Sequence, residues 1–266
     1  MKKLILHICI VTSFLYGCNK NEDTLPGHDG KIIVLMYHRI TEGEATNLYE
    51  RSADDLNADL VYLKINNIKL IDFEDLNNII ESGQMPHENS AIITFDDGDC
   101  SWYLTALPIL KKHQVKATFF LWAEKIGKDS FLTWQEVQYM SHYQLPGGKR
   151  PFTFGSHGFS HQYLLQRRSG YSSLDEYRSF LDYEMGISKQ LIEQYTPGEV
   201  TVFSLPFGDG AGDPEIKDAA LKNGYKFIRT SRYGPVTNSE KDLLNIPSLP
   251  ILDNTSPEEI GFYLGL

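Results

Sequence analysis

Short apolar runs alternate with amphipathic stretches along most of the chain. The apolar runs, which are typical of strands, cover residues 32–37, 68–71, 91–95, 117–121, 152–155, 201–205, 225–229 and 244–246. Stretches with helical spacing lie between them, at residues 54–66, 73–81, 103–113, 133–141, 174–195, 213–223 and 257–263. Two of these helices begin with the residue pair of a capping box, Thr133 with Glu136 and Ser173 with Glu176. The alternation predicts an α/β fold around a parallel sheet.

The length of the chain fits one substantial core better than two equal domains. The chain has 266 residues, of which 41% are hydrophobic, and no linker interrupts the alternation after residue 30. Seven or eight strand signals separated by helices favour a closed or nearly closed parallel barrel. An open, doubly wound sheet is the alternative architecture.

The N-terminal residues have the features of an export signal. Lys2 and Lys3 precede an apolar run at residues 4–15 that is too short to span a bilayer comfortably. The run ends in Leu-Tyr-Gly-Cys, which resembles the cleavage site of a bacterial lipoprotein, so we expect a signal peptide at residues 1–17 and a lipid on Cys18. An ordinary signal peptide is the alternative.

A lipid on Cys18 would anchor the protein in the cell envelope, at the periplasmic face or the outer surface. Residues 18–30 are polar and contain Gly and Pro, as expected of a tether, and residues 31–266 form the predicted folded domain. Cys9 lies in the signal, which leaves Cys100 alone, so we expect no disulfide within the mature chain. We interpret Cys100 as a packing residue.

The charge and the aromatic content narrow the range of partners. A net charge of −10 makes nucleic acid a poor partner, so no nucleic acid is expected. Aromatic residues make up 12% of the chain, which fits stacking on sugar rings, although most of them are expected in the core.

The strongest local signal is Thr94-Phe95-Asp96-Asp97-Gly98, at the end of an apolar run. Adjacent carboxylates repel each other, so a fold keeps both at a strand end only where a cation, hydrogen-bond donors or water compensates. Strand ends are also where barrels place catalysis. The dipeptide Asp96-Asp97 taken alone, however, favours a solvated turn.

The second signal is His157-Gly158-Phe159-Ser160-His161, which directly follows the predicted strand at residues 152–155. Two imidazoles four residues apart share one face of a helical turn and can bind one divalent ion. Such a pair taken alone is as often a surface feature. Together with one of the two aspartates, the pair would form three ligands that leave positions open for water and a substrate carbonyl, while the other aspartate acts as base.

These two motifs and Phe203-Ser204-Leu205-Pro206-Phe207-Gly208 resemble, in this order, the first three motifs of the polysaccharide deacetylase family, carbohydrate esterase family four. The resemblance spans roughly residues 32–251, which makes residues 31–266 the catalytic domain. It implies a distorted (β/α)-barrel with fewer repeats than an eightfold barrel, here with about seven parallel strands.

The resemblance also implies a role for each motif residue. Asp96 would be the general base, and Asp97, His157 and His161 would hold one divalent metal ion. Zinc is the expected metal, with cobalt or nickel as alternatives. The backbone N–H of Phe207 would donate to the oxyanion that forms when water attacks the acetyl carbonyl.

The acid that protonates the departing amine is expected at the other end of the chain. Many family members supply a histidine from a C-terminal motif, but no histidine follows His161. Met36-Tyr37-His38-Arg39 instead resembles the circularly shifted branch that includes poly-β-1,6-N-acetylglucosamine deacetylases, whose acid histidine comes from an N-terminal strand. We therefore assign His38 as the general acid. A strand-end histidine bonded to the backbone is the alternative.

One position departs from the family pattern. Ser204 stands where many relatives have an arginine that orients the base, and a serine supplies no positive charge. Arg150, Arg229 and Arg232 are the candidates to replace that arginine, and the sequence does not choose among them.

We therefore expect a monomeric hydrolase of carbon–nitrogen, non-peptide bonds that removes N-acetyl groups from an N-acetylhexosamine polysaccharide such as poly-N-acetylglucosamine. One alternative is an O-acetyl esterase that acts on a xylan-type glycan. Another is an inactive glycan-binding lipoprotein at the cell surface, which Ser204 and the missing C-terminal histidine would explain.

Overall fold

The computed structural model describes residues 29–239 and 241–266. The expected signal peptide at residues 1–17, Cys18 and residues 19–28 of the expected tether lie outside the described residues. Within the described part of the chain, no helix is both long and apolar enough to cross a membrane.

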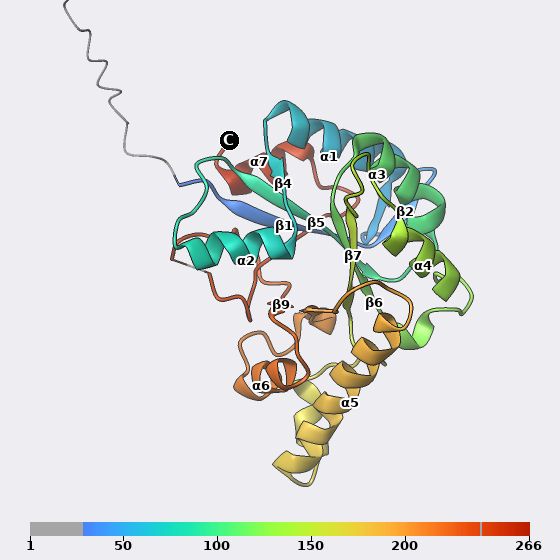
Figure 1. Cartoon of the computed structure of the whole chain (residues 1–266), viewed down its shortest axis with the longest axis vertical. Helices are drawn as coiled ribbons and strands as arrows, with labels where there is room; N and C mark the ends of the chain where they lie inside the picture. The colour runs from blue at the N-terminus through green and yellow to red at the C-terminus, as the bar shows by residue number, and fades with distance from the viewer. Residues whose placement is uncertain (1–28, 240) are drawn as a thin grey trace, which may run out of the picture.

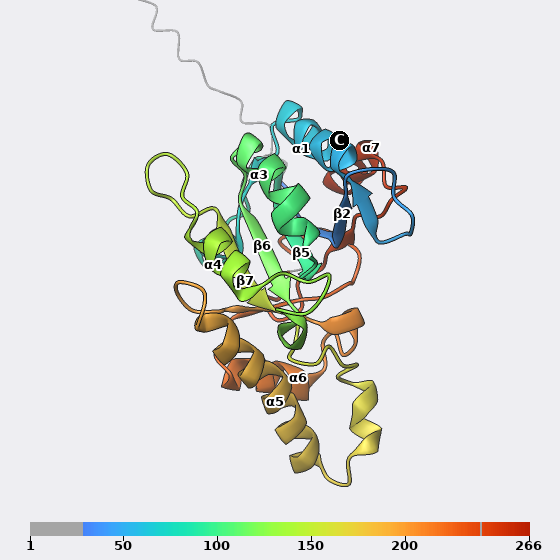
Figure 2. The same cartoon turned by 90° about the vertical axis from the view of Figure 1, so that its right-hand side faces the viewer.

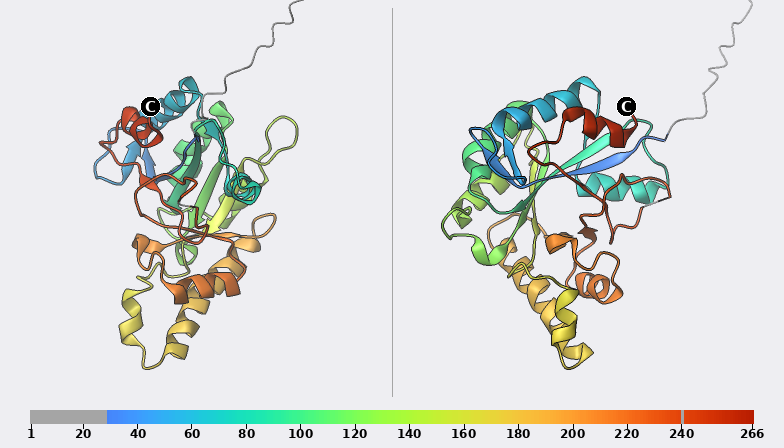
Figure 3. Two further views of the ribbon diagram at one scale, coloured as in Figure 1. Left: turned by 90° about the vertical axis from the view of Figure 1, so that its left-hand side faces the viewer. Right: turned by 180° about the vertical axis from the view of Figure 1, so that it is seen from behind.

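One parallel sheet forms the centre of the molecule (Figure 1). Its strands, in the order in which they lie side by side, are β10 (Leu249–Pro250), β1 (Ile32–Tyr37), β5 (Ser90–Asp97), β6 (Ala117–Leu121), β7 (Phe152–Ser156), β8 (Val202–Ser204) and β9 (Phe227–Arg229). A short further strand, β4 (Lys69–Leu70), pairs with β5. The sheet curls into a half-barrel (Figure 3), which confirms the predicted distorted (β/α)-barrel with about seven parallel strands.

Helices flank the curled sheet (Figure 2). They are α1 (Ala53–Ile65), α2 (Phe73–Ser82), α3 (Leu107–His113), α4 (Trp134–His142), α5 (Leu174–Glu193), α6 (Pro214–Lys222) and α7 (Pro257–Leu264). A π-helical turn, Trp102–Ala106, precedes α3, and 3-10 turns lie at Ala123–Lys125, Gln166–Gly170 and Pro206–Gly208. The predicted capping box of α4 forms with both of its bonds. At α5, Ser173 accepts the N–H of Glu176, but Glu176 accepts the N–H of Ser172, so the expected box is only half formed.

Alternate residues of the central strands face two different cores. Ile33, Leu35 and Tyr37 of β1 pack under the helices, whereas Ile32 and Val34 pack inside the curl of the sheet. Every residue of β1 is buried, because a strand in the middle of a parallel sheet is covered on both faces. These continuous apolar runs are the reason that the sequence locates the central strands.

The last strand differs from the expectation at residues 244–246. Ile246 makes only a single parallel bridge to Arg229 of β9, and Leu249–Pro250 pairs with β1. The chain thus passes from one edge of the curl to the other within a few residues, too few for a regular strand. No pattern in the sequence indicates β2 (Arg39–Thr41) and β3 (Glu50–Ser52), which pair outside the main sheet and are too short to show a period.

Candidate active site

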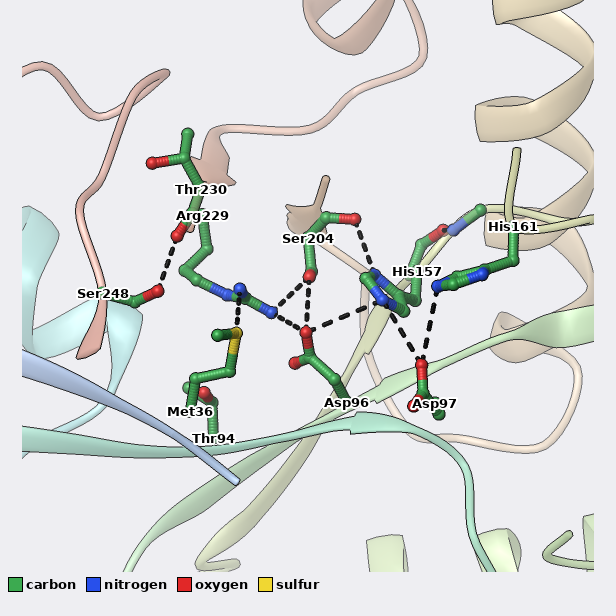
Figure 4. A network of polar contacts seen from close by, with 12 residues as sticks. Met36, Thr94, Asp96, Asp97, His157, His161, Ser204, Arg229, Thr230 and Ser248 are labelled. Atoms are coloured by element: carbon green, nitrogen blue, oxygen red, sulfur yellow. Dashed lines mark hydrogen bonds and ion pairs between the residues drawn. The ribbon is translucent and has the colours of Figure 1, made fainter. Parts of the chain in front are cut away.

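Polar residues stand at the carboxyl ends of five strands of the sheet. They are His38 after β1, Asp96 and Asp97 in β5, His157 after β7, Ser204 in β8 and Arg229 in β9. Because the strands are parallel, these ends share one rim of the curl, which is where barrel enzymes carry their chemistry. Figure 4 shows the side chains that come from β5 and from the ends of β7, β8 and β9.

Asp97, His157 and His161 lie close enough together to hold one metal ion. A possible ligand atom of each lies within 4.8 Å of the others. Oδ1 of Asp97 is 3.6 Å from Nε2 of His157 and 3.5 Å from Nε2 of His161 (Figure 4). The structure therefore brings together the three residues that the sequence predicts as ligands.

A loop, not the expected helical turn, brings the two histidines together. Gly158 and His161 both have left-handed backbone conformations, with φ of 80° and 55°. Two such residues so close in sequence are incompatible with an α-helix, so the helical interpretation of the spacing was wrong. The indole of Trp122 stacks on the ring of His161, with centroids 4.6 Å apart, and limits how that ring can turn.

The protonation states of these three residues suit a cation. Burial lowers the pKa of His157 to about 3 and that of His161 to about 4, so both imidazoles are neutral at neutral pH. Nδ1 of His157 lies 2.9 Å from the carbonyl of Ser204, which fixes the proton there and leaves Nε2 as a lone pair. Burial, and then the charge of Asp96, raise the pKa of Asp97 to about 7. Asp97, His157 and His161 together offer three ligand atoms and carry no positive charge. A divalent ion would bind to these atoms and supply that charge.

Asp96 lies beside the three candidate ligands, and only one of its two carboxylate oxygens is hydrogen-bonded to another described residue. Its Oδ2 accepts the hydroxyl of Ser204 at 3.2 Å and forms an ion pair with the guanidinium of Arg229. Burial alone would raise the pKa of Asp96, but the charge of Arg229, helped by His157 and His38, outweighs it and holds the pKa below its ordinary value. Oδ1 is buried and has no hydrogen-bond partner among the described residues.

Arg229 is the arginine that compensates for Ser204. It is fully buried, donates to Ser204 as well as to Asp96, and contacts Sδ of Met36 (Figure 4). Of the other two candidates, Arg150 is exposed and Arg232 donates to the carbonyl of Asn245. The hydroxyl of Ser204 in β8 therefore bridges Asp96 and the guanidinium of Arg229, which belongs to the neighbouring strand β9.

His38 lies at the same rim, near Asp96. Burial lowers the pKa of His38, the charge of Asp96 opposes this shift, and Arg229 adds to it. Its Nδ1 is buried without a hydrogen-bond partner in the described part of the chain, so the ring is not tied to the backbone through that atom. Its carbonyl accepts the indole N–H of Trp102 at 2.7 Å, which fixes its backbone.

Phe207 lies next to His161. The two ring centroids are 4.5 Å apart, and Phe207 has a left-handed backbone with φ of 58°. A bulky residue rarely adopts this conformation, and it occurs here beside the candidate metal ligands. The position suits the predicted oxyanion donor, whose role stays a prediction.

Glu184 is a residue of this site that the sequence analysis missed. It is buried in α5, and its carboxylate accepts both the N–H and the hydroxyl of Ser160. Its carbonyl also accepts the N–H of Phe159 at 3.0 Å. Glu184 thereby holds the loop between the two histidines. An acidic residue on the apolar face of α5, beside Leu181 and Met185, was the available signal.

Residues 83–228 match the family model described as polysaccharide deacetylase. The matched stretch is more than half of the chain and contains the candidate ligands and Asp96. The chain belongs to the polysaccharide deacetylase family. This polysaccharide deacetylase is therefore a hydrolase acting on carbon–nitrogen bonds, as the sequence predicted.

Curated relatives and solved structures agree with this family. The poly-beta-1,6-N-acetyl-D-glucosamine N-deacetylase of Staphylococcus epidermidis is 24% identical over 245 residues, which cover 87% of this chain and 82% of that one. The Streptococcus pyogenes deacetylase PplD, solved in complex with acetate, superposes with a TM-score of 0.75 at 23% identity and covers 89% of this chain and 99% of its own. IcaB from Ammonifex degensii superposes with a TM-score of 0.73 at 19% identity, and the match covers 89% of this chain and 98% of that one. At these identities the solved structures support the fold alone.

The Asp96–Arg229 pair predicts a strong coupling in stability. Arg229→Met leaves a buried carboxylate without its cation, so we expect the free energy of unfolding to fall by about 3–5 kcal/mol. Adding Asp96→Asn should recover part of this loss, because the unpaired charge is then gone. Denaturant unfolding of the two single variants and the double variant measures the coupling. Lys222→Met, which breaks an exposed pair with Asp182, is the control and should cost less than about 1 kcal/mol. An equal loss in both Met variants would contradict the assignment.

The loop held by Glu184 predicts a weaker metal site when that contact is lost. Glu184→Ala frees Ser160 and lets the two histidines separate, so we expect zinc affinity to fall about 10- to 100-fold. Competition with a chromophoric chelator measures the affinity, and circular dichroism checks that the fold survives. Glu193→Ala, in the same helix but paired with Lys189, is the control and should bind zinc like the parent protein. Unchanged affinity in a folded Glu184→Ala protein would show that the loop does not need this contact.

Proposed function

We propose that this polysaccharide deacetylase removes N-acetyl groups from an N-acetylhexosamine polymer such as poly-N-acetylglucosamine, with one divalent metal ion as cofactor. The observation that carries the proposal is the convergence of Asp97, His157 and His161 beside a held carboxylate, Asp96. The name of the Staphylococcus epidermidis relative supports the choice of polymer. The position of His38 after β1 supports the amide, because a departing amine needs an acid.

The metal would be held by Asp97, His157 and His161, and we propose zinc, with cobalt or nickel as alternatives. When bound, it supplies Lewis acidity for the acetyl carbonyl and lowers the pKa of water. Two neutral imidazoles and one carboxylate are a ligand set that zinc favours in hydrolases and that leaves coordination positions open.

Asp96 acts as the general base in this proposal. Its free oxygen, Oδ1, accepts a proton from the attacking water, while Arg229 and Ser204 hold Oδ2. The low pKa of Asp96 keeps the carboxylate ionised and ready to accept. The water oxygen bonds to the acetyl carbon, and the carbonyl oxygen becomes an oxyanion that accepts the backbone N–H of Phe207.

His38 acts as the general acid. When the carbon–nitrogen bond breaks, the amine nitrogen takes a proton from the imidazolium of His38, and acetate leaves with the water oxygen. Burial lowers the pKa of His38, the charge of Asp96 opposes this shift and Arg229 adds to it, so the imidazolium gives up its proton readily to the amine. The base thus lies in β5 and the acid directly after β1, and these two strands pair side by side.

We propose the cell envelope as the place of action, with a lipid on Cys18 as the membrane anchor. The basis is the N-terminal sequence, in which an apolar run after two lysines ends in Gly17-Cys18. A polymer that is too large to enter the cell would be modified outside it.

Acetate release is the direct test of the activity. Pure protein with added Zn²⁺ should release acetate from N-acetylated β-1,6-glucosamine oligomers, and chelation should abolish the release. Asp96→Asn should lose about 100-fold or more in kcat yet still bind zinc, whereas His157→Ala should lose zinc itself. Metal analysis of both variants separates the two roles.

Other outcomes of the assay would favour one of the alternative functions or contradict the assigned base. Acetate from acetylated xylan alone would favour the O-acetyl esterase. Oligosaccharide binding in calorimetry without any turnover would indicate the inactive glycan-binding protein. Full activity of Asp96→Asn would refute the assignment of the base.

The proposed acid predicts a dependence on the leaving group. His38→Ala should lose about 100-fold in kcat on an acetamide, because an amine anion is a very poor leaving group, and much less on an acetate ester. Measuring both substrates with one protein cancels any general effect on folding. His142→Ala, an exposed histidine bonded within its own helix, is the control. Equal losses on amide and ester would contradict the role of His38 as acid.

A further inference from the structure

Exposed aromatic rings border the candidate metal site on the side of His161. Tyr163 and Phe207 stack face to face, with centroids 4.0 Å apart and an angle of 10° between the rings. They are 41% and 53% exposed, although most large apolar residues of the described chain are buried. Phe207 also contacts His161, so the stacked pair is continuous with the site.

This stacked pair is held in a fixed position. Phe207 keeps its left-handed backbone in the turn Pro206–Gly208, and its ring contacts both Tyr163 and His161. Holding two large rings half exposed forgoes the stabilisation that their burial would give. A ligand that covers the rings would recover this stabilisation.

A second exposed ring lies next to His38, which follows β1, whereas His161 follows β7. Tyr49 is 55% exposed, and its ring meets the ring of His38 edge-on at 5.1 Å. The neighbouring Glu50 is buried and accepts both the N–H and the hydroxyl of Thr46, which fixes the loop that carries Tyr49. Exposed aromatic rings therefore contact both the candidate ligand His161 and the candidate acid His38.

We infer that these two surfaces, the Tyr163–Phe207 pair and Tyr49, bind the hexosamine units that flank the unit being deacetylated. The inference rests on the proposed function and adds to it the path of the polymer across the site. A polymer that places one unit at the metal must lay its neighbours on the surface at either side. The faces of pyranose rings expose C–H groups, which are attracted to the negative face of an aromatic ring, and tyrosine loses little conformational entropy on binding.

The gain in kcat/KM with chain length tests the inference. With zinc and β-1,6-linked N-acetylglucosamine oligomers, we expect kcat/KM of the parent protein to rise from the dimer to the hexamer. In Tyr163→Ala and in Tyr49→Ala, the ratio of hexamer to dimer should fall about five- to tenfold, through KM and not kcat. Tyr163→Phe keeps the ring and should keep the ratio.

Tyr139→Ala is the matched control. Tyr139 is 50% exposed and contacts Tyr103 and Lys111, not the candidate site, so its removal should leave the ratio unchanged. An unchanged ratio in both Tyr163→Ala and Tyr49→Ala would overturn the inference, as would a Tyr163→Phe protein that behaves like Tyr163→Ala.

Failure of the proposed function gives a different result. If the parent protein releases no acetate from any oligomer, that function is wrong, and calorimetric binding of the hexamer then decides on the aromatic surfaces. If Tyr163→Ala and Tyr49→Ala bind the hexamer more weakly than Tyr139→Ala does, the aromatic surfaces bind the polymer. Equal binding by all three variants would overturn the inference.

Discussion

The buried ion pair between Asp96 and Arg229 is the interaction on which the candidate site depends. Asp96 is the second-last residue of β5 and Arg229 is the last residue of β9, and three strands separate β5 from β9 in the sheet. In a flat sheet the two side chains would lie far apart, because neighbouring strands are spaced about 4.8 Å apart. The pair forms only because the sheet curls, so that both side chains point into the same interior. The fold therefore sets the protonation state of the base.

The adjacent aspartates serve different purposes because the chain turns between them. Asp96 is the last residue of β5 with a side chain in the curl, alongside Thr94, and it meets Arg229 there. Asp97 has a φ of 93°, which departs from strand geometry and directs its carboxylate toward His157 and His161. Their repulsion is then met by two separate partners, a guanidinium for Asp96 and, in the proposed function, a cation for Asp97.

Local patterns along the chain predict the central strands and the rim on which the site is built. The central strands are continuous apolar runs, and those of β5 and β7 lead into Asp97 and His157 at the rim, so the fold and the meeting of these two residues could be predicted. Contacts between strands that meet only because the sheet curls could not be predicted. Arg229 lies far from Asp96 in sequence, and nothing local distinguished it from Arg150 or Arg232. The conformation of the loop before His161 depends on Glu184 in α5, so the spacing of the histidines alone suggested a helix.

The contact with Arg229 also removes the reason to interpret Ser204 as a sign of lost activity. A serine in place of the family arginine was one of the two reasons to consider an inactive protein, together with the missing C-terminal histidine. In the structure, Ser204 is buried and donates to Asp96 while it accepts from Arg229. A second arginine at that position would bring another cation into a buried space that already holds one, at a high cost in desolvation and repulsion. The small hydroxyl is what allows Arg229 to reach the base. The departure from the motif therefore moves the positive charge from one strand to the next without removing it.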